Sequence, residues 1–202
     1  MSVTTVALTT TFLPTTGPVK HLWTVSEFQR MGKTRFLDPR ARMELIEGEL
    51  FDMAPIGSFH AGTVTLLAHL FARAIGETAV VSVQNPIDLS ERSEPQPDLM
   101  LLRPNPNYYL NDHPHAEDVL LLIEVSDSTV QFDRKTKVPL YARHGIPEVW
   151  LVVGPRRRHI EVYRDPQPER GGYRTQLQVR EGMLTPTLLP EAGIRLEEVF
   201  PG

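Results

Sequence analysis

The stretch Val119-Leu120-Leu121-Leu122-Ile123-Glu124-Val125 decides the fold, because every residue in it except Glu124 is apolar. A short, nearly continuous apolar run is typical of a strand that is buried on both faces of a sheet. We therefore predict a central strand over residues 119–125. A buried carboxylate without a partner is costly, so Glu124 needs a cationic partner or a metal ion.

Helical and strand patterns alternate on both sides of this run. Apolar residues at helical spacing predict a helix over residues 60–75 that stops at Gly76. The order of a helix, three strands, a helix and a strand predicts an α/β or α+β fold, with a mixed sheet flanked by helices. The further elements expected are a helix over 24–31 capped by Thr24 or Ser26, a hairpin over 43–53, strands over 80–83, 96–102, 148–153, 158–164 and 173–179, and a helix over 133–144 that starts on Asp133 and bends or starts late at Pro139.

The composition is that of an ordinary globular protein. Hydrophobic residues make up 41% of the 202 and charged residues 23%, a balance that argues against a disordered or fibrous chain. The absence of cysteine excludes disulfides and thiolate metal ligands. Because no apolar stretch approaches the roughly 20 residues that cross a bilayer, we expect a soluble, cytoplasmic protein. We expect the Thr-rich residues 1–18 to form a flexible tail and residues 19–202 to form one domain.

Asp98 and Glu124 are the acidic residues whose surroundings stand out. Asp98 follows Pro97 and precedes the apolar run 99–102, so both carboxylates lie on or beside apolar strands. If these strands are neighbours, the two acids converge on one hard cation such as magnesium, which takes one or two carboxylates and keeps several waters. Either residue alone is equally well explained as an acid at a strand end that is bonded to backbone or to an arginine.

Lys137 supplies a third element, because it lies in the first turns of the helix that follows the Glu124 strand. A lysine near a metal-activated water orients the nucleophile and offsets the charge that builds on a phosphate. Tyr141 lies one helical turn further along the same face. Taken by itself, a lysine on a helix is more simply a solvated surface residue.

Four blocks of the sequence resemble the signatures of the Uma family of restriction endonucleases, in the PD-(D/E)XK restriction-endonuclease-like superfamily. The blocks are Glu44-Leu45-Ile46-Glu47-Gly48-Glu49, Glu94-Pro95-Gln96-Pro97-Asp98, Leu122-Ile123-Glu124-Val125-Ser126 and Lys137-Val138-Pro139-Leu140-Tyr141-Ala142-Arg143-His144-Gly145-Ile146-Pro147-Glu148-Val149-Trp150. The resemblance extends from about residue 26 to residue 200. It implies a restriction-endonuclease-like core, with an extra amino-terminal hairpin and extra carboxy-terminal strands.

The resemblance also implies a role for each matched residue. Asp98 corresponds to the acid of the PD half-motif and Glu124 to the acid of (D/E)XK, both as metal ligands. The lysine of that motif would stand at position 126, where this chain has Ser126. In this family the lysine has moved to the following helix, which nominates Lys137 over Lys135 as the third catalytic residue. The implied cofactor is Mg²⁺ or Mn²⁺, the implied partner is DNA, and a homodimer is expected.

Three further residues would support the same site. Glu44 and His60 lie in or near the amino-terminal blocks, Glu44 as a further ligand or base and His60 at the start of a helix. Tyr141 is the third, on the same helix face as Lys137. The simpler alternatives are a salt bridge within the hairpin for Glu44 and a helix cap for His60.

The formal net charge of -4 argues against a broad electrostatic grip on nucleic acid. A local positive funnel would still form if folding gathers Arg134, Arg143 and the run 156–158, of which Arg157 is the expected DNA contact. The alternative for that run is a solvated turn. The sequence His113-Pro114-His115 is typical of a loop rather than of a metal site. The common nucleotide-binding, zinc-protease and serine-hydrolase motifs are absent.

Two functions remain open on these observations. The first is a metal-dependent endonuclease that hydrolyses DNA. The second is a nuclease-like fold that binds or regulates without cleaving, which Ser126 in place of the motif's lysine and the acidic balance favour. A titration with magnesium or manganese separates them, because only the first needs a metal ion.

Overall fold

The computed structural model describes residues 17–200 except 35, 37, 39 and 40. The expected flexible tail over 1–18 lies outside this range apart from its last two residues, and it stays a prediction. Within the described residues, no helix is both long and apolar enough to span a membrane.

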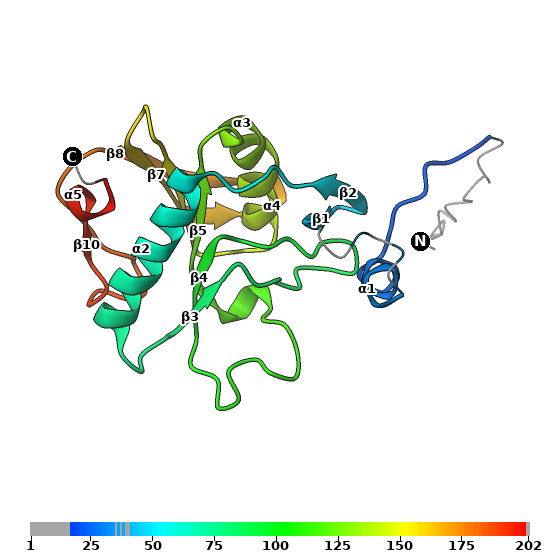
Figure 1. The fold of residues 1–202 in the computed structure, drawn as a ribbon, viewed down its shortest axis with the longest axis horizontal. Coiled ribbons are helices and arrows are strands. Elements are labelled where there is room, and N and C mark those ends of the chain that lie inside the picture. The colour runs from blue at the N-terminus through cyan, green and yellow to red at the C-terminus, as the bar shows by residue number, and fades with distance from the viewer. Residues whose placement is uncertain (1–16, 35, 37, 39–40, 201–202) are drawn as a thin grey trace, which may run out of the picture.

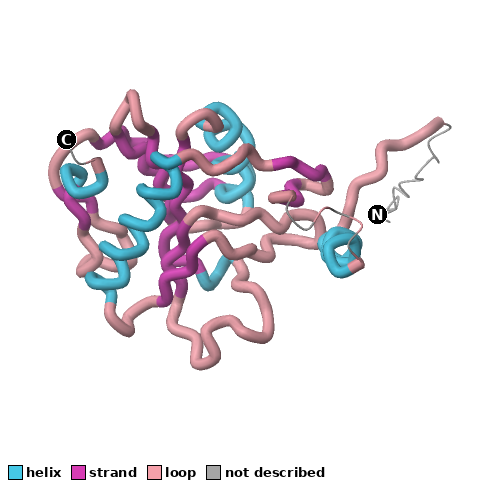
Figure 2. The backbone as a smooth tube through the Cα atoms, in the orientation of Figure 1, coloured by secondary structure: helices cyan, strands magenta, loops and turns pink. Residues whose placement is uncertain are grey.

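A six-stranded mixed sheet forms the centre of the molecule (Figures 1 and 2). Its strands, in spatial order, are β3 (Val80–Val83), β4 (Leu99–Leu102), β5 (Val119–Ser126), β6 (Glu148–Val153), β7 (His159–Gln167) and β8 (Gly172–Val179). Only β5 and β6 run parallel, and every other neighbouring pair is antiparallel. All eight residues of β5 are buried. The predicted central strand and the mixed sheet are therefore confirmed.

Helices cover both faces of this sheet (Figure 1). One face packs against α2 (Ser58–Ile75), α5 (Leu196–Val199) and a small hairpin of β9 (Met183–Leu184) and β10 (Ile194–Arg195). The other face packs against a helical run made of α3 (Val130–Phe132), the π-helical turn η2 (Asp133–Lys137) and α4 (Val138–Arg143). Leu121 and Ile123 belong to the α2 side and Leu122 to the α4 side. Because side chains alternate along a strand, Glu124 faces the α4 side.

The amino-terminal part adds α1 (Val25–Lys33) and a hairpin of β1 (Met43–Ile46) and β2 (Glu49–Asp52). Of the two caps that the sequence allows, Thr24 is the one that caps α1, in a capping box with Glu27. Glu47 and Gly48 form the hairpin turn with φ of 50° and 83°. A two-residue turn with both φ values positive matches the twist of the strands. Short 3-10 turns at Ala116–Asp118 (η1) and Pro168–Arg170 (η3) complete the elements.

Two sequence-based boundaries were wrong. The strand expected over 96–102 begins at Leu99, because Pro95 and Pro97 have no N–H to give to a ladder. The helix expected to start on Asp133 starts at Val130 instead, and Asp133 lies inside it. Pro139 removes one backbone donor, and the run adapts with the π-helical turn directly before it. The elements from β9 to α5 were not predicted.

Gly154, directly after β6, is a point of close approach between β6 and α2. A Cβ on Gly154 would lie 1.9 Å from Cζ of Phe59, the residue beside His60 in α2. We expect Gly154→Ala to lower the free energy of unfolding by about 1–3 kcal/mol, because the ring must move. Urea denaturation measures the change.

The matched control is Gly62→Ala on the exposed side of α2, where a Cβ meets nothing within 4 Å. This variant should gain about 1 kcal/mol from helix propensity. Unchanged stability of Gly154→Ala would show that Phe59 does not hold α2 against β6.

Candidate active site

A cavity of about 140 Å³ lies where the carboxyl end of β5 meets the start of α2, the hairpin and the π-helical turn. Five acidic side chains, two cationic side chains and one histidine line it: Glu44, Asp98, Glu124, Asp127, Asp133, Arg42, Lys137 and His60. The predicted residues Asp98, Glu124, Lys137, Glu44 and His60 are thus brought together from five separate segments. A larger cavity of about 740 Å³ between α1 and the loop containing His113 holds none of them.

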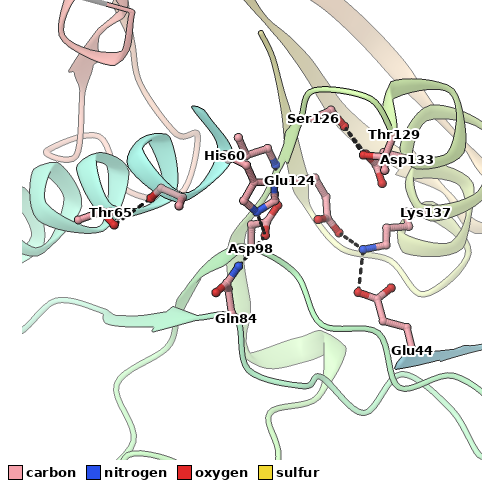
Figure 3. A network of polar contacts seen from close by, with 12 residues as sticks. Glu44, His60, Thr65, Gln84, Asp98, Glu124, Ser126, Thr129, Asp133 and Lys137 are labelled. Carbon is pink, nitrogen blue, oxygen red and sulfur yellow. Dashed lines mark hydrogen bonds and ion pairs between the residues drawn. The ribbon is translucent and has the colours of Figure 1, made fainter. Parts of the chain in front are cut away.

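Lys137 lies at the centre of the site, between two glutamates (Figure 3). Its Nζ donates to Glu44 Oε1 at 3.0 Å and to Glu124 Oε1 at 3.1 Å. Tyr141 lies one helical turn further on and donates its hydroxyl to the same Glu124 oxygen at 2.5 Å. The Lys137 side chain is 2% exposed, so the alternative of a solvated surface lysine is excluded.

The charges of this group are unequal, since one ammonium faces two carboxylates. Burial would lower the pKa of Lys137, but the charges of Glu124 and Glu44 outweigh it and raise that pKa above its ordinary value. Lys137 therefore keeps its proton. Burial raises the pKa of Glu44, and raises that of Glu124 well above the ordinary value, against the pull of Lys137. Glu44 and Glu124 consequently bind a proton more readily than surface glutamates do.

Asp98 is held as an ionised carboxylate. It accepts the backbone N–H of Val125 at 2.8 Å on Oδ2, and on Oδ1 it meets His60 Nε2 at 2.8 Å and the amide of Gln84 at 3.3 Å (Figure 3). Burial would raise its pKa, but the bond to His60, the charge of His60 and the Val125 N–H lower it overall. The Val125 bond fixes Asp98 beside Glu124, the neighbour of Val125 on β5.

Comparison with known proteins places the chain in a family. A family model named Uma2 and described as "Putative restriction endonuclease" matches residues 25–197. The chain belongs to the Uma2 family. No curated protein sequence matches it significantly.

A solved structure shares the fold. It is described as the crystal structure of a "putative nuclease belonging to DUF820" from Anabaena variabilis ATCC 29413. The two chains are 16% identical with a TM-score of 0.69, and the match covers 88% of this chain and 97% of that one. The expected restriction-endonuclease-like fold is confirmed for this Uma2 protein. The nuclease-like classification comes from the family model.

The three arginines expected to contact DNA do not line the Uma2 cavity. Arg134 forms a two-pronged ion pair with Glu161, at 2.6 and 3.0 Å, and Arg143 donates to Glu47 at 2.8 Å. Arg157 lies in the exposed turn before β7. The arginine that does reach the cavity is Arg42, which the sequence analysis did not single out.

The oxygens left over in the cavity suit a hard divalent cation. Glu44 Oε2 is buried and has no hydrogen-bond partner among the residues that the structure describes. Both donors to Glu124 use Oε1, and no bond to its Oε2 occurs within the described residues. No three acidic or histidine side chains of the described part are close enough to form a complete metal site. Magnesium does not need one, because it binds through one or two carboxylates and keeps several waters.

Proposed function

We propose that this Uma2 protein hydrolyses phosphodiester bonds in DNA with the help of Mg²⁺ or Mn²⁺. The observation that carries the proposal is the buried Lys137 ammonium held between Glu44 and Glu124, in the same cavity as the ionised Asp98. A protonated lysine can offset the charge that develops in phosphoryl transfer, and the neighbouring carboxylates can hold a metal ion that activates water.

Asp98 and Glu124 would hold the metal ion. When bound, the ion acts as a Lewis acid toward the phosphate and acidifies a water molecule. Lys137 has three N–H donors, of which the two glutamates take two. The third would donate to a phosphate oxygen and offset the charge that grows as water attacks phosphorus and the P–O bond to the leaving strand breaks. Glu44 aims the ammonium, and its Oε2 would accept a proton from the attacking water.

The charges of the cavity also favour a required metal ion. Five carboxylates line it against the fixed cations Lys137 and Arg42. An anionic phosphate would be repelled from such a surface unless a divalent cation offsets the excess. We therefore expect cleavage to depend fully on added metal.

Arg42 is the proposed contact for a phosphate next to the scissile one. It lies at the cavity wall, and its side chain has no ion pair within the described residues. We expect Arg42→Ala to raise KM for DNA with little change in kcat, and to reduce the slope of log affinity against log salt by about 1. Salt-dependent binding measured by fluorescence anisotropy tests this, with Arg170→Ala, an exposed arginine in η3, as the control.

The second candidate, a binding module that does not cleave, rests on Asp98. Three donors already occupy its carboxylate, as in a purely structural acid. This candidate predicts that neither Mg²⁺ nor Mn²⁺ binds the cavity, whereas the nuclease requires that one of them does.

The experiment for the proposed activity is a panel of supercoiled plasmid, linear duplex, branched DNA and single strands, each incubated with Mg²⁺, Mn²⁺ or EDTA. Metal-dependent products from at least one substrate support the nuclease. Linear product from supercoiled plasmid would indicate two cooperating copies, the proposed homodimer, and nicked circles a single one. Binding without products from any substrate, in either metal, would favour the binding module.

A further inference from the structure

A second polar cluster lies beside the catalytic group, at the last residue of β5. Asp133 is buried, and its Oδ2 accepts the hydroxyl of Ser126 and, at 2.8 Å, the hydroxyl of Thr129 (Figure 3). The backbone N–H of Asp133 also donates to the Thr129 carbonyl at 3.0 Å. We call these three residues the clasp. It ties the end of the central strand to the start of the helical run that carries Lys137.

The clasp and the pair of Glu124 and Lys137 connect the same two elements, β5 and the π-helical turn. Ser126 stands two residues after Glu124 on β5, so both side chains face the α4 side of the sheet. Asp133 and Lys137 are the first and last residues of the π-helical turn, which the Val138 N–H closes on the Asp133 carbonyl. Ser126 meets the first residue of that turn and Glu124 meets the last. β5 thus contacts both ends of the π-helical turn.

We infer that the clasp of Ser126, Thr129 and Asp133 is a positioning device that sets Lys137 against Glu124. Ser126 stands where the motif of the superfamily would have its lysine. In this chain the Ser126 hydroxyl instead holds the π-helical turn that carries Lys137. The inference rests on the proposed nuclease function for its effect on rate, but not for its effect on the lysine.

A role confined to folding does not explain two features. The first is that Asp133 lines the catalytic cavity, where its charge acts on Lys137 and Glu124. The second is the placement of the π-helical turn: Pro139 accounts for a break in the α-helical bonding, but not for the contact of both ends of the turn with β5 beside the cavity. Turns of this kind are rare and are frequent at functional sites. An ordinary α-helical turn there would rotate the side chains that follow by a large part of a turn and carry Lys137 away from Glu124.

The first arm of the test measures the lysine directly, without activity. Trace acetylation followed by mass spectrometry reports how often each lysine is exposed, with Lys33 and Lys135 as exposed references in the same molecule. The variants are Ser126→Ala, Asp133→Asn and the near-isosteric Thr129→Val, with Thr129→Ser as the version that keeps the hydroxyl. Ser82→Ala is the matched control, because Ser82 is a buried sheet serine that accepts one bond from Asn85 away from the cavity.

We expect Lys137 labelling to rise about tenfold in Ser126→Ala and Asp133→Asn, the effect of losing one bond to a charged group. Thr129→Val should show a smaller rise and Thr129→Ser none. Labelling of Lys137 that stays at the wild-type level in both Ser126→Ala and Thr129→Val would overturn the inference, and neither variant removes a charge that folding needs.

The second arm measures cleavage. If the wild type cleaves DNA, Ser126→Ala should lower kcat with KM nearly unchanged, because Ser126, unlike Thr129 and Asp133, does not line the cavity. Equal kcat in Ser126→Ala and wild type would overturn the positioning role. If the wild type cleaves nothing, the proposed function fails, while the labelling result still decides whether the clasp positions Lys137.

Discussion

Replacing Lys137 by methionine will lower metal-dependent DNA cleavage by about a hundredfold or more, because the charge on the phosphate loses its counterpart. The same change leaves Glu44 and Glu124 buried side by side without their shared cation. Removing one partner of a buried ion pair costs about 3–5 kcal/mol of stability. Both pKa values are already raised, so the two acids take up protons, and the loss of stability will be larger at high pH than at low pH.

A double variant separates the loss of stability from the loss of cleavage. Lys137→Met combined with Glu44→Gln removes one positive and one negative charge, and should recover much of the lost stability without recovering cleavage. Lys135→Met, at an exposed lysine in the same turn, is the control and should match the wild type. If the double variant cleaves DNA at the wild-type rate, Lys137 is a structural cation only.

Affinity for Mg²⁺ or Mn²⁺ will rise with pH, and Glu124→Gln will abolish it. Burial raises the pKa of Glu124 well above the usual value, so a proton occupies the carboxylate at low pH and competes with the metal ion. While Glu124 is mostly protonated, releasing one proton per bound metal gives a limiting gain of about tenfold in affinity per pH unit. The amide of glutamine has the same shape but no charge, and cannot replace the carboxylate.

Isothermal titration calorimetry in two buffers of different ionisation enthalpy counts the protons released. The control is Glu169→Gln, at an exposed glutamate in η3. Affinity that does not rise at any pH above 4.5, the ordinary pKa of a glutamate, or full binding by Glu124→Gln, would place the metal ion elsewhere.

The parts of the site that depend on strand pattern could be predicted from the sequence. The apolar run around Glu124 fixed a buried strand, and a carboxylate within it needed a partner. Asp98 before the neighbouring strand followed from the same reasoning. That Lys137 is the buried partner of Glu124 could not be derived from the pattern alone. Its burial depends on the register of the helical run, and the π-helical turn that sets this register has no clear signature in sequence. Asp133 accordingly looked like a helix cap rather than a wall of the cavity.

The expected DNA contacts show a different limit. Arg134 and Arg143 lie close to the site in sequence, but their partners Glu161 and Glu47 come from distant segments that no local pattern reveals. Each arginine forms an ion pair with its glutamate and does not line the cavity. Arg42 precedes the first hairpin strand, and only the folded hairpin brings it to the cavity. Ion pairing between distant segments is a tertiary property.

The most direct test of the account compares four proteins on one preparation schedule: the wild type, Asp98→Asn, Glu124→Gln and a control in which exposed Glu169 becomes glutamine. Each is incubated with the DNA that the wild type cleaves best, with Mn²⁺ and with EDTA. We predict metal-dependent cleavage by the wild type and the control, and none above the EDTA background by the other two. Cleavage that persists in both Asp98→Asn and Glu124→Gln would contradict the assignment of this cavity as the catalytic centre.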